Sequence, residues 1–279
     1  MPLPNALTIA GFDPSGGAGV LADARSFASF GYRASAAITS ITFQNDESAT
    51  GAVHQTAAAV RGQVSSLLEQ FQFACAKTGL LPTREVVHEI ACIFRDGKLP
   101  APVVDPVMVS SSGMTLMEAD ALEILISELL PIARLVTPNI PEAEALAGLH
   151  ITSEAEMTEA AKFIRGLGAR AVLIKGGHLK EQKSEVRSQK SESEGGSPIL
   201  NEGSNAGPAY TSTAEAVDVL DDEGAMTVFR AELIPGASLR GSGCILSAAI
   251  AAGLGKGMSL EDSVRQAKDF VLNKLRGVP

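Results

Sequence analysis

Residues 7–27, LTIAGFDPSGGAGVLADARSF, hold the pattern that decides the fold: a short apolar run, a glycine-rich turn and a run with helical periodicity. This order predicts a strand, a tight turn between Gly11 and Gly19, and a helix, which together begin a βαβ unit. Glycines in such a turn permit positive φ and leave no Cβ in the way of a ligand, and free N–H groups at a helix start attract anions. Taken alone, the turn is as consistent with a structural role as with a ligand site.

The same turn also matches a loose nucleotide motif. Residues 17–22 fit G-x-G-x-x-A, the dinucleotide fingerprint, and Asp46 lies near the spacing at which a ribose-binding acid is expected. The match is weak, and no Lys-Ser or Lys-Thr pair follows the glycines, which excludes a P-loop. A nucleotide-dependent oxidoreductase is therefore one alternative function.

The rest of the chain repeats the alternation of short β-branched runs and longer amphipathic stretches. The expected strands are residues 6–10, 34–42, 74–78, 103–105, 135–137, 171–175, and a hairpin of 216–220 and 226–231 joined by DDEG. The expected helices are residues 18–30, 56–71, 84–94, 118–130, 141–147, 154–167, 242–252 and 260–274. This alternation predicts an α/β fold with a mostly parallel central sheet. The length of the chain allows one large domain or two small ones.

Composition excludes several classes of protein. The 279 residues are 45% hydrophobic, and their formal net charge of -9 argues against general binding to nucleic acid or to an anionic membrane. No window offers the ~18 apolar residues of a membrane span, and no targeting segment is found. The three cysteines form no C-x-x-C pair, which argues against a disulfide framework or a zinc site. We therefore expect a cytoplasmic protein.

Residues 179–210, LKEQKSEVRSQKSESEGGSPILNEGSNAGPAY, break the alternating pattern. They are rich in Ser, Glu, Lys and Gly and contain few residues that form a core. We interpret the segment as a mobile surface insertion. A lid over a site is the alternative, but the composition favours a solvated loop.

A second glycine-rich turn, Gly241-Ser242-Gly243-Cys244, stands at the start of the expected helix 242–252. A dinucleotide-binding domain needs one such turn, so two turns suggest two ligands. The first N–H groups of a helix have no internal partner and lie at the positive end of its dipole, so this turn can hold a phosphoryl group. The same field is expected to lower the pKa of Cys244, which could then accept a proton at neutral pH. The alternative is a small cysteine that packs at a helix start, as we expect of the other two cysteines.

Polar residues follow three further expected strands: Asp105 in VVDPVM, Asn139 and Glu142 in LVTPNIPEAEAL, and Lys175 in VLIKGGH. In open parallel sheets, ligands bind outside the carboxyl ends of the strands. Asp105 and Glu142 suit Mg²⁺, directly or through water, and Lys175 suits the charge of a phosphate. Singly, these residues could cap a turn, open a helix or be a solvated charge. Their joint placement predicts a site for a metal-nucleotide complex.

Together these motifs resemble the hydroxymethylpyrimidine and hydroxymethylpyrimidine-phosphate kinases of the ribokinase-like fold. The matching segments, in order, are GFDPSGGAG from Gly11, Gln44-Asn45, DPVM from Asp105, TPNIPE from Thr137, KGGH from Lys175 and GSGC from Gly241. The resemblance runs from Asn5 to about Phe270, the insertion excepted. It implies a single domain over residues 1–279 that forms a three-layer α/β/α sandwich, and a homodimer. It also implies MgATP-dependent phosphorylation of 4-amino-5-hydroxymethyl-2-methylpyrimidine and its monophosphate in thiamine biosynthesis. It leaves open whether a monovalent cation is needed and whether one or both steps are catalysed.

The resemblance also implies roles for individual residues. The polar edge of the pyrimidine would meet Gly11, Asp23 and Gln44, and its faces would meet Leu80 and Val107. Cys244 would take the proton from the hydroxymethyl group, or from the bound phosphate in the second step, while the N–H groups of residues 241–244 hold the transferring group. Mg²⁺ would be positioned by Asp105 and Glu142 and its water shell ordered by Asn139, and Lys175 would neutralise the departing phosphate.

Two positions depart from the family pattern. Arg240 stands before Gly241 where the family usually has histidine, and Leu80 stands where a methionine often faces the pyrimidine. Pyridoxal kinases of the same cysteine-bearing branch are the nearest alternative, because their substrate has a similar size and shape. A pyrimidine-binding protein without catalysis is a more remote alternative, against which the intact Cys244, Glu142 and Lys175 argue.

Overall fold

Nine strands form one sheet in the part of the chain that the computed structural model describes, residues 2–110, 113–177, 215–232, 234 and 239–277. The strand order is β3 (Ala49–His54), β2 (Arg33–Gln44), β1 (Asn5–Phe12), β4 (Phe73–Thr78), β5 (Val103–Val104), β6 (Leu135–Val136), β7 (Ala171–Lys175), β8 (Glu215–Asp222) and β9 (Ala225–Glu232). The six strands from β2 to β7 in this order run parallel, whereas β3, β8 and β9 are antiparallel to their neighbours. The carboxyl ends of the parallel strands therefore meet along one edge.

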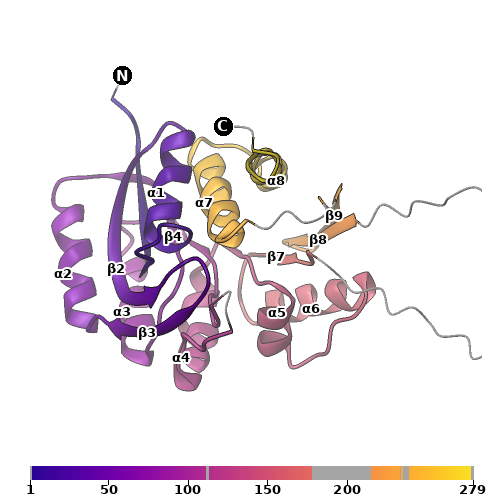
Figure 1. The fold of residues 1–279 in the computed structure, drawn as a ribbon, viewed down its shortest axis with the longest axis horizontal. Coiled ribbons are helices and arrows are strands. Elements are labelled where there is room, and N and C mark those ends of the chain that lie inside the picture. Colours follow the sequence, from indigo (N-terminus) through magenta and orange to yellow (C-terminus); the bar gives the residue numbers. More distant parts are fainter. Residues whose placement is uncertain (1, 111–112, 178–214, 233, 235–238, 278–279) are drawn as a thin grey trace, which may run out of the picture.

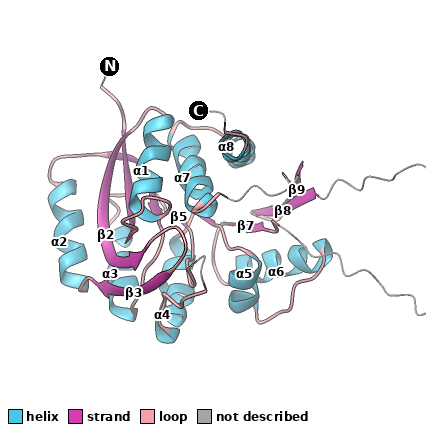
Figure 2. Cartoon of the chain, viewed as in Figure 1, coloured by secondary structure: helices cyan, strands magenta, loops and turns pink. Residues whose placement is uncertain are grey.

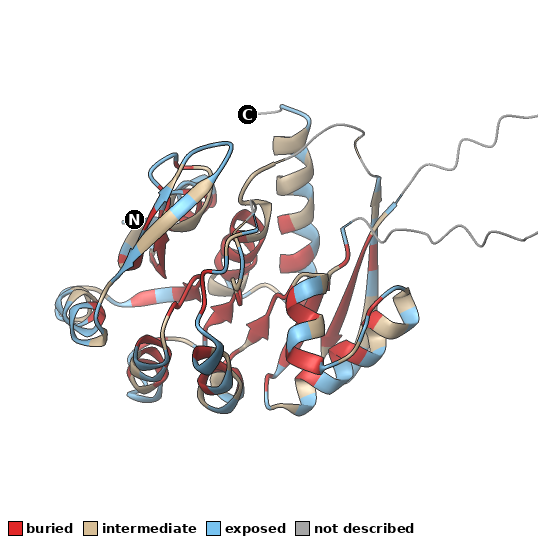
Figure 3. Cartoon of the chain, turned by 60° about the horizontal axis from the view of Figure 1, so that its bottom comes forward, coloured by how far each residue is buried: buried red, intermediate tan, exposed pale blue. Residues whose placement is uncertain are grey.

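Helices cover both faces of the sheet, with the buried strands between them (Figures 1 and 3). One face packs against α1 (Gly19–Ser29), α7 (Ser242–Gly255) and α8 (Leu260–Leu275). The other face packs against α2 (Ala57–Leu68), α3 (Arg84–Arg95), α4 (Ala119–Ile124), α5 (Ile140–Ala147) and α6 (Glu154–Gly166). This arrangement confirms the predicted three-layer α/β/α sandwich.

The composition of β7 shows why a central strand of this sheet is almost wholly apolar. Successive side chains of a strand point to opposite faces, so Ala171 and Leu173 enter the core under α7 and α8. Val172 and Ile174 enter the other core. Because both faces are covered by helices, the strand has no solvent face that needs a polar residue. Lys175 is the last residue of β7 and lies at the edge of the sheet where the carboxyl ends of the parallel strands meet.

The structure differs from the sequence-based expectation at one edge of the sheet. Strand β3 was not predicted, and β2 runs two residues beyond its expected end to Gln44. Strand β3, ATGAVH, is short, lacks clear alternation and has no buried residue, so its pattern is that of a loop. Pairing with β2 makes it a strand, and the two form a curved ribbon at the edge of the sheet (Figure 2).

The helix expected at residues 118–130 is also divided. It continues from α4 into a π-helical turn, Leu125–Leu129, and a 3-10 turn, Leu130–Ile132. Pro131 lies in the last turn, where its missing N–H removes one helical hydrogen bond.

The expected hairpin is confirmed as β8 and β9. Its DDEG turn places Glu223 at φ 55 and Gly224 at φ 100, the left-handed values that a two-residue hairpin turn requires. The predicted insertion, residues 179–210, lies outside the described residues. No helix in the described ranges is long and apolar enough to cross a membrane.

Candidate active site

A cavity of about 780 Å³ opens at the carboxyl ends of the parallel strands. It is bounded on one side by the turn that joins β2 to β3 and on another by the start of α7. Every residue predicted for the site lines it except Asp23: Gly11, Gln44, Leu80, Asp105, Val107, Asn139, Glu142, Lys175, Gly241, Ser242, Gly243 and Cys244. The structure therefore brings together residues from seven separate segments of the chain.

The start of α7 lines the cavity and packs against the first glycine turn. Helix α7 begins at Ser242, as predicted, and its N-cap Gly241 offers no side chain to the first N–H groups. Gly241 has φ 68, and a Cβ on it would lie 2.2 Å from the carbonyl oxygen of Gly17. The two glycine turns thus pack backbone against backbone, and only glycine fits at residue 241. The uncapped helix start favours an anion in the cavity.

The strand ends supply a buried charge pair at the cavity wall. Nζ of Lys175 lies 2.9 Å from Oδ1 of Asp105, whose side chain is 2% exposed. Thr137 also donates to this carboxylate, over 3.3 Å. Burial alone would raise the pKa of Asp105, but the charges of Lys175 and Lys77 outweigh burial and lower that pKa. Asp105 is therefore a stable carboxylate in the cavity wall.

Asn139 and Glu142 hold each other at the start of α5. The Asn139 side chain accepts from the Glu142 N–H over 2.9 Å, and the Glu142 carboxylate accepts from the Asn139 N–H over 2.8 Å, which is a capping box. Burial raises the pKa of Glu142 to about 7, and the nearby Asp105 charge adds to this while Lys175 opposes it. A cation brought into the cavity would favour the ionised form of Glu142.

Cys244 lines the cavity, but its titration differs from the expectation. From the sequence, the thiol at the start of a helix is expected to have a lowered pKa. Burial instead raises the pKa of Cys244 to about 12, and Asp105 and Asp23 add to this, although Lys77 and a hydrogen bond from the Gly19 N–H oppose it. The thiol is therefore neutral at physiological pH, because desolvation outweighs the helix dipole.

Asp23 is the predicted substrate residue that the structure places elsewhere. Its side chain is fully buried and does not line the cavity. Both carboxylate oxygens lie 2.9 Å from Nζ of Lys77, and Thr8 donates to one of them over 2.6 Å. The carboxylate oxygens thus already have partners inside the protein, and a contact of Asp23 with the polar edge of the pyrimidine stays a prediction.

The sequence-based prediction gave no role to Asp13, which lines the cavity, or to Lys77, the buried partner of Asp23. Asp13 lines the cavity and accepts from the Ser15 N–H and hydroxyl and from the Ala18 N–H, all within 2.9 Å. The sequence Asp-Pro-Ser-Gly, residues 13–16, is typical of such a turn and could have indicated this role of Asp13. Lys77 is a charged residue within a largely apolar run, CAKTGL, and this position could have indicated a buried charge. Burial opposes its charge, but Asp23 raises the pKa of Lys77 above its usual range.

A second cavity, of about 430 Å³, adjoins the first. It shares Asn139, Lys175, Ser242 and Gly243 with the first cavity and extends between the β8–β9 hairpin and α8. The walls of the extension are mainly apolar, with Leu246, Val271, Leu272 and Leu275 among them. A flat apolar group attached to a phosphate chain in the first cavity would fit here.

Residues 13–278 match the family described as "Phosphomethylpyrimidine kinase". The chain belongs to this family. A hydroxymethylpyrimidine/phosphomethylpyrimidine kinase of Rhizobium meliloti is 38% identical over 268 residues, which cover 95% of this chain and 88% of the relative. The family membership confirms the resemblance stated above and makes the chain a phosphotransferase.

Solved structures of the family and of its neighbours agree with the fold. A phosphomethylpyrimidine kinase from Clostridium difficile superposes with a TM-score of 0.76 at 30% identity, over 98% of this chain and 99% of that chain. A pyridoxal kinase from Staphylococcus aureus in complex with ADP superposes with a TM-score of 0.78 at 28% identity, over 97% of this chain and 87% of that chain. The ribokinase-like fold is confirmed, and the oxidoreductase alternative is excluded.

Proposed function

We propose that this kinase phosphorylates 4-amino-5-hydroxymethyl-2-methylpyrimidine and then its monophosphate in thiamine biosynthesis, with MgATP as the donor. One observation carries the proposal. A single cavity is lined both by an uncapped helix start next to Cys244 and by Gly11 and Gln44. An acceptor bound to those groups would direct its hydroxymethyl group at the anion site.

The pyrimidine side of the cavity supports the substrate class. Gln44 offers one carbonyl and one amide NH₂, so it can pair with both a donor and an acceptor on an aminopyrimidine edge. Leu80 and Val107 supply apolar surface for the ring faces. A Cβ added to Gly11 would lie 3.1 Å from the Leu80 side chain, so Leu80 packs directly against Gly11 in this part of the cavity.

The nucleotide side supports MgATP. Asp105 and Glu142 give carboxylate oxygens, but Lys175 already pairs with one oxygen of Asp105. This donor set fits Mg²⁺ held mainly through water and nucleotide phosphates. Bound there, Mg²⁺ would neutralise charge that develops on the phosphates. The adenine would lie in the second cavity, between the hairpin and α8.

The chain's own residues have defined tasks in the reaction. The acceptor oxygen loses its proton to Cys244, forms a bond to the γ-phosphorus and displaces ADP, while the first N–H groups of α7 hold the transferring group. Cys244 must itself be deprotonated before it can act as this base, because burial raises its pKa to about 12. Lys77 is the positive group that opposes this rise.

Pyridoxal is the second candidate substrate, since solved pyridoxal kinases superpose on this chain as well as the phosphomethylpyrimidine kinase does. The test is ADP release from MgATP with hydroxymethylpyrimidine, its monophosphate and pyridoxal offered separately. We expect turnover of both pyrimidines, and a loss of roughly 10²–10⁴-fold for Cys244→Ala. Cys92→Ala, which lies outside both cavities, is the matched control and keeps full activity.

The outcomes separate the parts of the proposal. Turnover of pyridoxal alone would show that the substrate assignment is wrong and leave the kinase assignment intact. Full activity of Cys244→Ala would remove the cysteine from the proton transfer. Omission of K⁺ in the same assay tests the monovalent cation.

We also propose that the enzyme is a cytoplasmic homodimer, as the sequence and the resemblance imply. Light scattering of the purified protein checks the dimer, and cell fractionation checks the compartment.

A further inference from the structure

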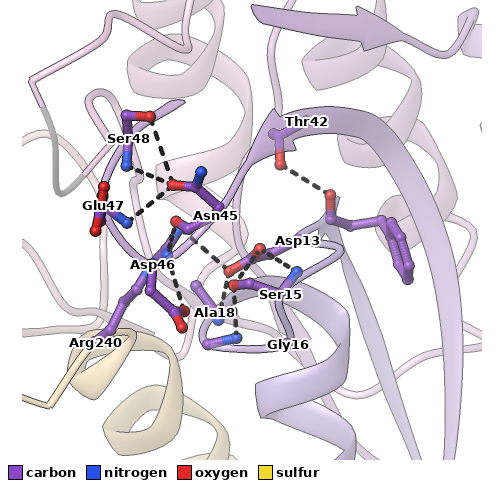
Figure 4. Close-up of polar contacts among 12 residues, drawn as sticks. Asp13, Ser15, Gly16, Ala18, Thr42, Asn45, Asp46, Glu47, Ser48 and Arg240 are labelled. Carbon is purple, nitrogen blue, oxygen red and sulfur yellow. Dashed lines mark hydrogen bonds and ion pairs between the residues drawn. The ribbon is translucent and has the colours of Figure 1, made fainter. Parts of the chain in front are cut away.

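Arg240 lines the cavity and joins three segments that border it. It stands directly before Gly241, and its side chain is 19% exposed. Its Nη1 donates to the carbonyl oxygen of Asn45 and lies 3.5 Å from Oδ1 of Asp46, while its Nη2 lies 3.5 Å from Oδ2 of Asp13 (Figure 4). Arg240 directly precedes the second glycine turn, and its guanidinium contacts the first glycine turn and the turn between β2 and β3.

The contact with Asp13 is made to a rigid group. The Asp13 side chain is 2% exposed and already accepts three hydrogen bonds from Ser15 and Ala18. The stem of Arg240 is also fixed, because a Cβ on Gly17 would lie 3.0 Å from its Cδ. The buried Nε of Arg240 has no partner among the described residues. The three contacts of the Nη atoms therefore place the guanidinium, which donates to the Asn45 carbonyl.

The segment that Arg240 holds is the turn that follows Gln44. Within it, the Asn45 side chain accepts from the N–H groups of Glu47 and Ser48, each over 2.9 Å. The turn is therefore ordered as a unit, and its first residue is the neighbour of Gln44. A contact that fixes the Asn45 carbonyl also limits the movement of Gln44 at the pyrimidine side of the cavity.

We propose that Arg240 is a positioning residue that holds the turn of residues 45–48, and through it Gln44, against the two glycine turns, and that it thereby sets the affinity for the pyrimidine. The inference rests on the proposed function. None of the polar contacts recorded for Arg240 is with Asn139, Glu142 or Lys175 on the nucleotide side. Its loss is therefore expected to act on the acceptor and not on MgATP.

The test compares Arg240→Met, Arg240→Lys and Arg170→Met with the wild type. Methionine keeps an apolar stem against Gly17 and removes the charge, whereas lysine keeps the charge. Arg170 pairs with the exposed Glu223 at the opposite end of the sheet, so Arg170→Met controls for the loss of one arginine. The measurements are the KM of the pyrimidine, the KM of MgATP, and hydrogen exchange of a peptide that spans residues 43–50.

We expect Arg240→Met to raise the KM of the pyrimidine about tenfold, as the loss of a charged hydrogen bond predicts. The KM of MgATP stays within about twofold, because the mutation leaves the nucleotide groups in place. Exchange of the 43–50 peptide becomes faster in Arg240→Met, Arg240→Lys is intermediate, and Arg170→Met matches the wild type. A structural defect alone would move both KM values and the exchange of the whole chain together.

An unchanged KM for the pyrimidine together with unchanged exchange of the 43–50 peptide would overturn the inference, as would equal changes in both KM values. If the wild type turns over no pyrimidine, the proposed function fails and the effect on affinity fails with it. The hydrogen exchange, which needs no substrate, still shows in that case whether Arg240 holds the turn.

Discussion

Cys244 is subject to two opposing physical effects. Its place at the start of α7 favours a thiolate, because the helix dipole is positive there. Its burial and the neighbouring carboxylates favour the neutral thiol, and these effects are larger. The environment of Asp23 is likewise set by a distant residue, because Lys77, its ion-pair partner, is 54 residues away in the chain. The chemistry of both side chains thus depends on groups that only the fold brings near.

The raised pKa of Cys244 predicts the pH dependence of its alkylation. At pH 8 a thiol with a pKa of about 12 is thiolate in only about one molecule in 10⁴. We therefore expect the rate of reaction with iodoacetamide in the ligand-free protein to rise about tenfold per pH unit from pH 7 to pH 10, without a plateau.

Peptide mass spectrometry gives this rate separately for Cys244 and for the partly exposed Cys92, which serves as the internal reference. The slope against pH reports the pKa, whereas the absolute rate also reports access. A plateau near pH 7 would instead support the lowered pKa that the sequence suggested.

The elements that form the site are the two glycine turns, and their contact is steric. Gly241 and Gly17 approach so closely that no side chain fits at residue 241. Gly257, after the end of α7, has a similar positive φ of 80 but no atom within 4 Å of an added Cβ. Alanine substitutions at residues 241 and 257 therefore distinguish the free-energy cost of a left-handed backbone from the cost of a steric clash.

Gly257→Ala is expected to lower the free energy of unfolding by about 1–2 kcal/mol, which is the cost of a left-handed conformation for alanine. Gly241→Ala carries the same conformational cost and must in addition push the first glycine turn away. We expect a larger loss of stability and a loss of ADP release, because the anion site is deformed. Urea unfolding and the kinase assay check this; equal effects of the two variants would show that the turns can separate freely.

At the scale of the whole molecule, the sheet decides which distant segments meet. Strands β7 and β8 are antiparallel neighbours, and Lys175 pairs with Asp218 although 42 residues separate them. All of the residues that pair β7 with β8 are among those that the structure describes. The predicted insertion, residues 179–210, therefore connects two strand ends that a short loop could join, which supports the prediction of a single domain with an inserted loop.

Replacement of residues 179–210 by a short Gly/Ser linker tests this prediction. We expect a free energy of unfolding that is unchanged or higher by about 0.6 kcal/mol for each halving of the loop, because a shorter loop costs less entropy to close. The KM of the pyrimidine stays unchanged. Urea unfolding and the kinase assay measure both quantities. A large loss of stability would show that the segment is part of the fold, and a loss of turnover alone would favour the lid.

Local sequence patterns are enough to predict the order of most elements, the two glycine turns and the polar residues at the strand ends, because these follow from periodicity and from the conformational freedom of glycine. Four features depend instead on contacts made in the folded chain: β3 is a strand, Asp23 pairs with Lys77, the Cys244 thiol is neutral, and Arg240 reaches Asp13 and Asn45. Strand pairing, desolvation and charge pairing depend on groups far apart in the chain, and no local pattern records which of them will meet.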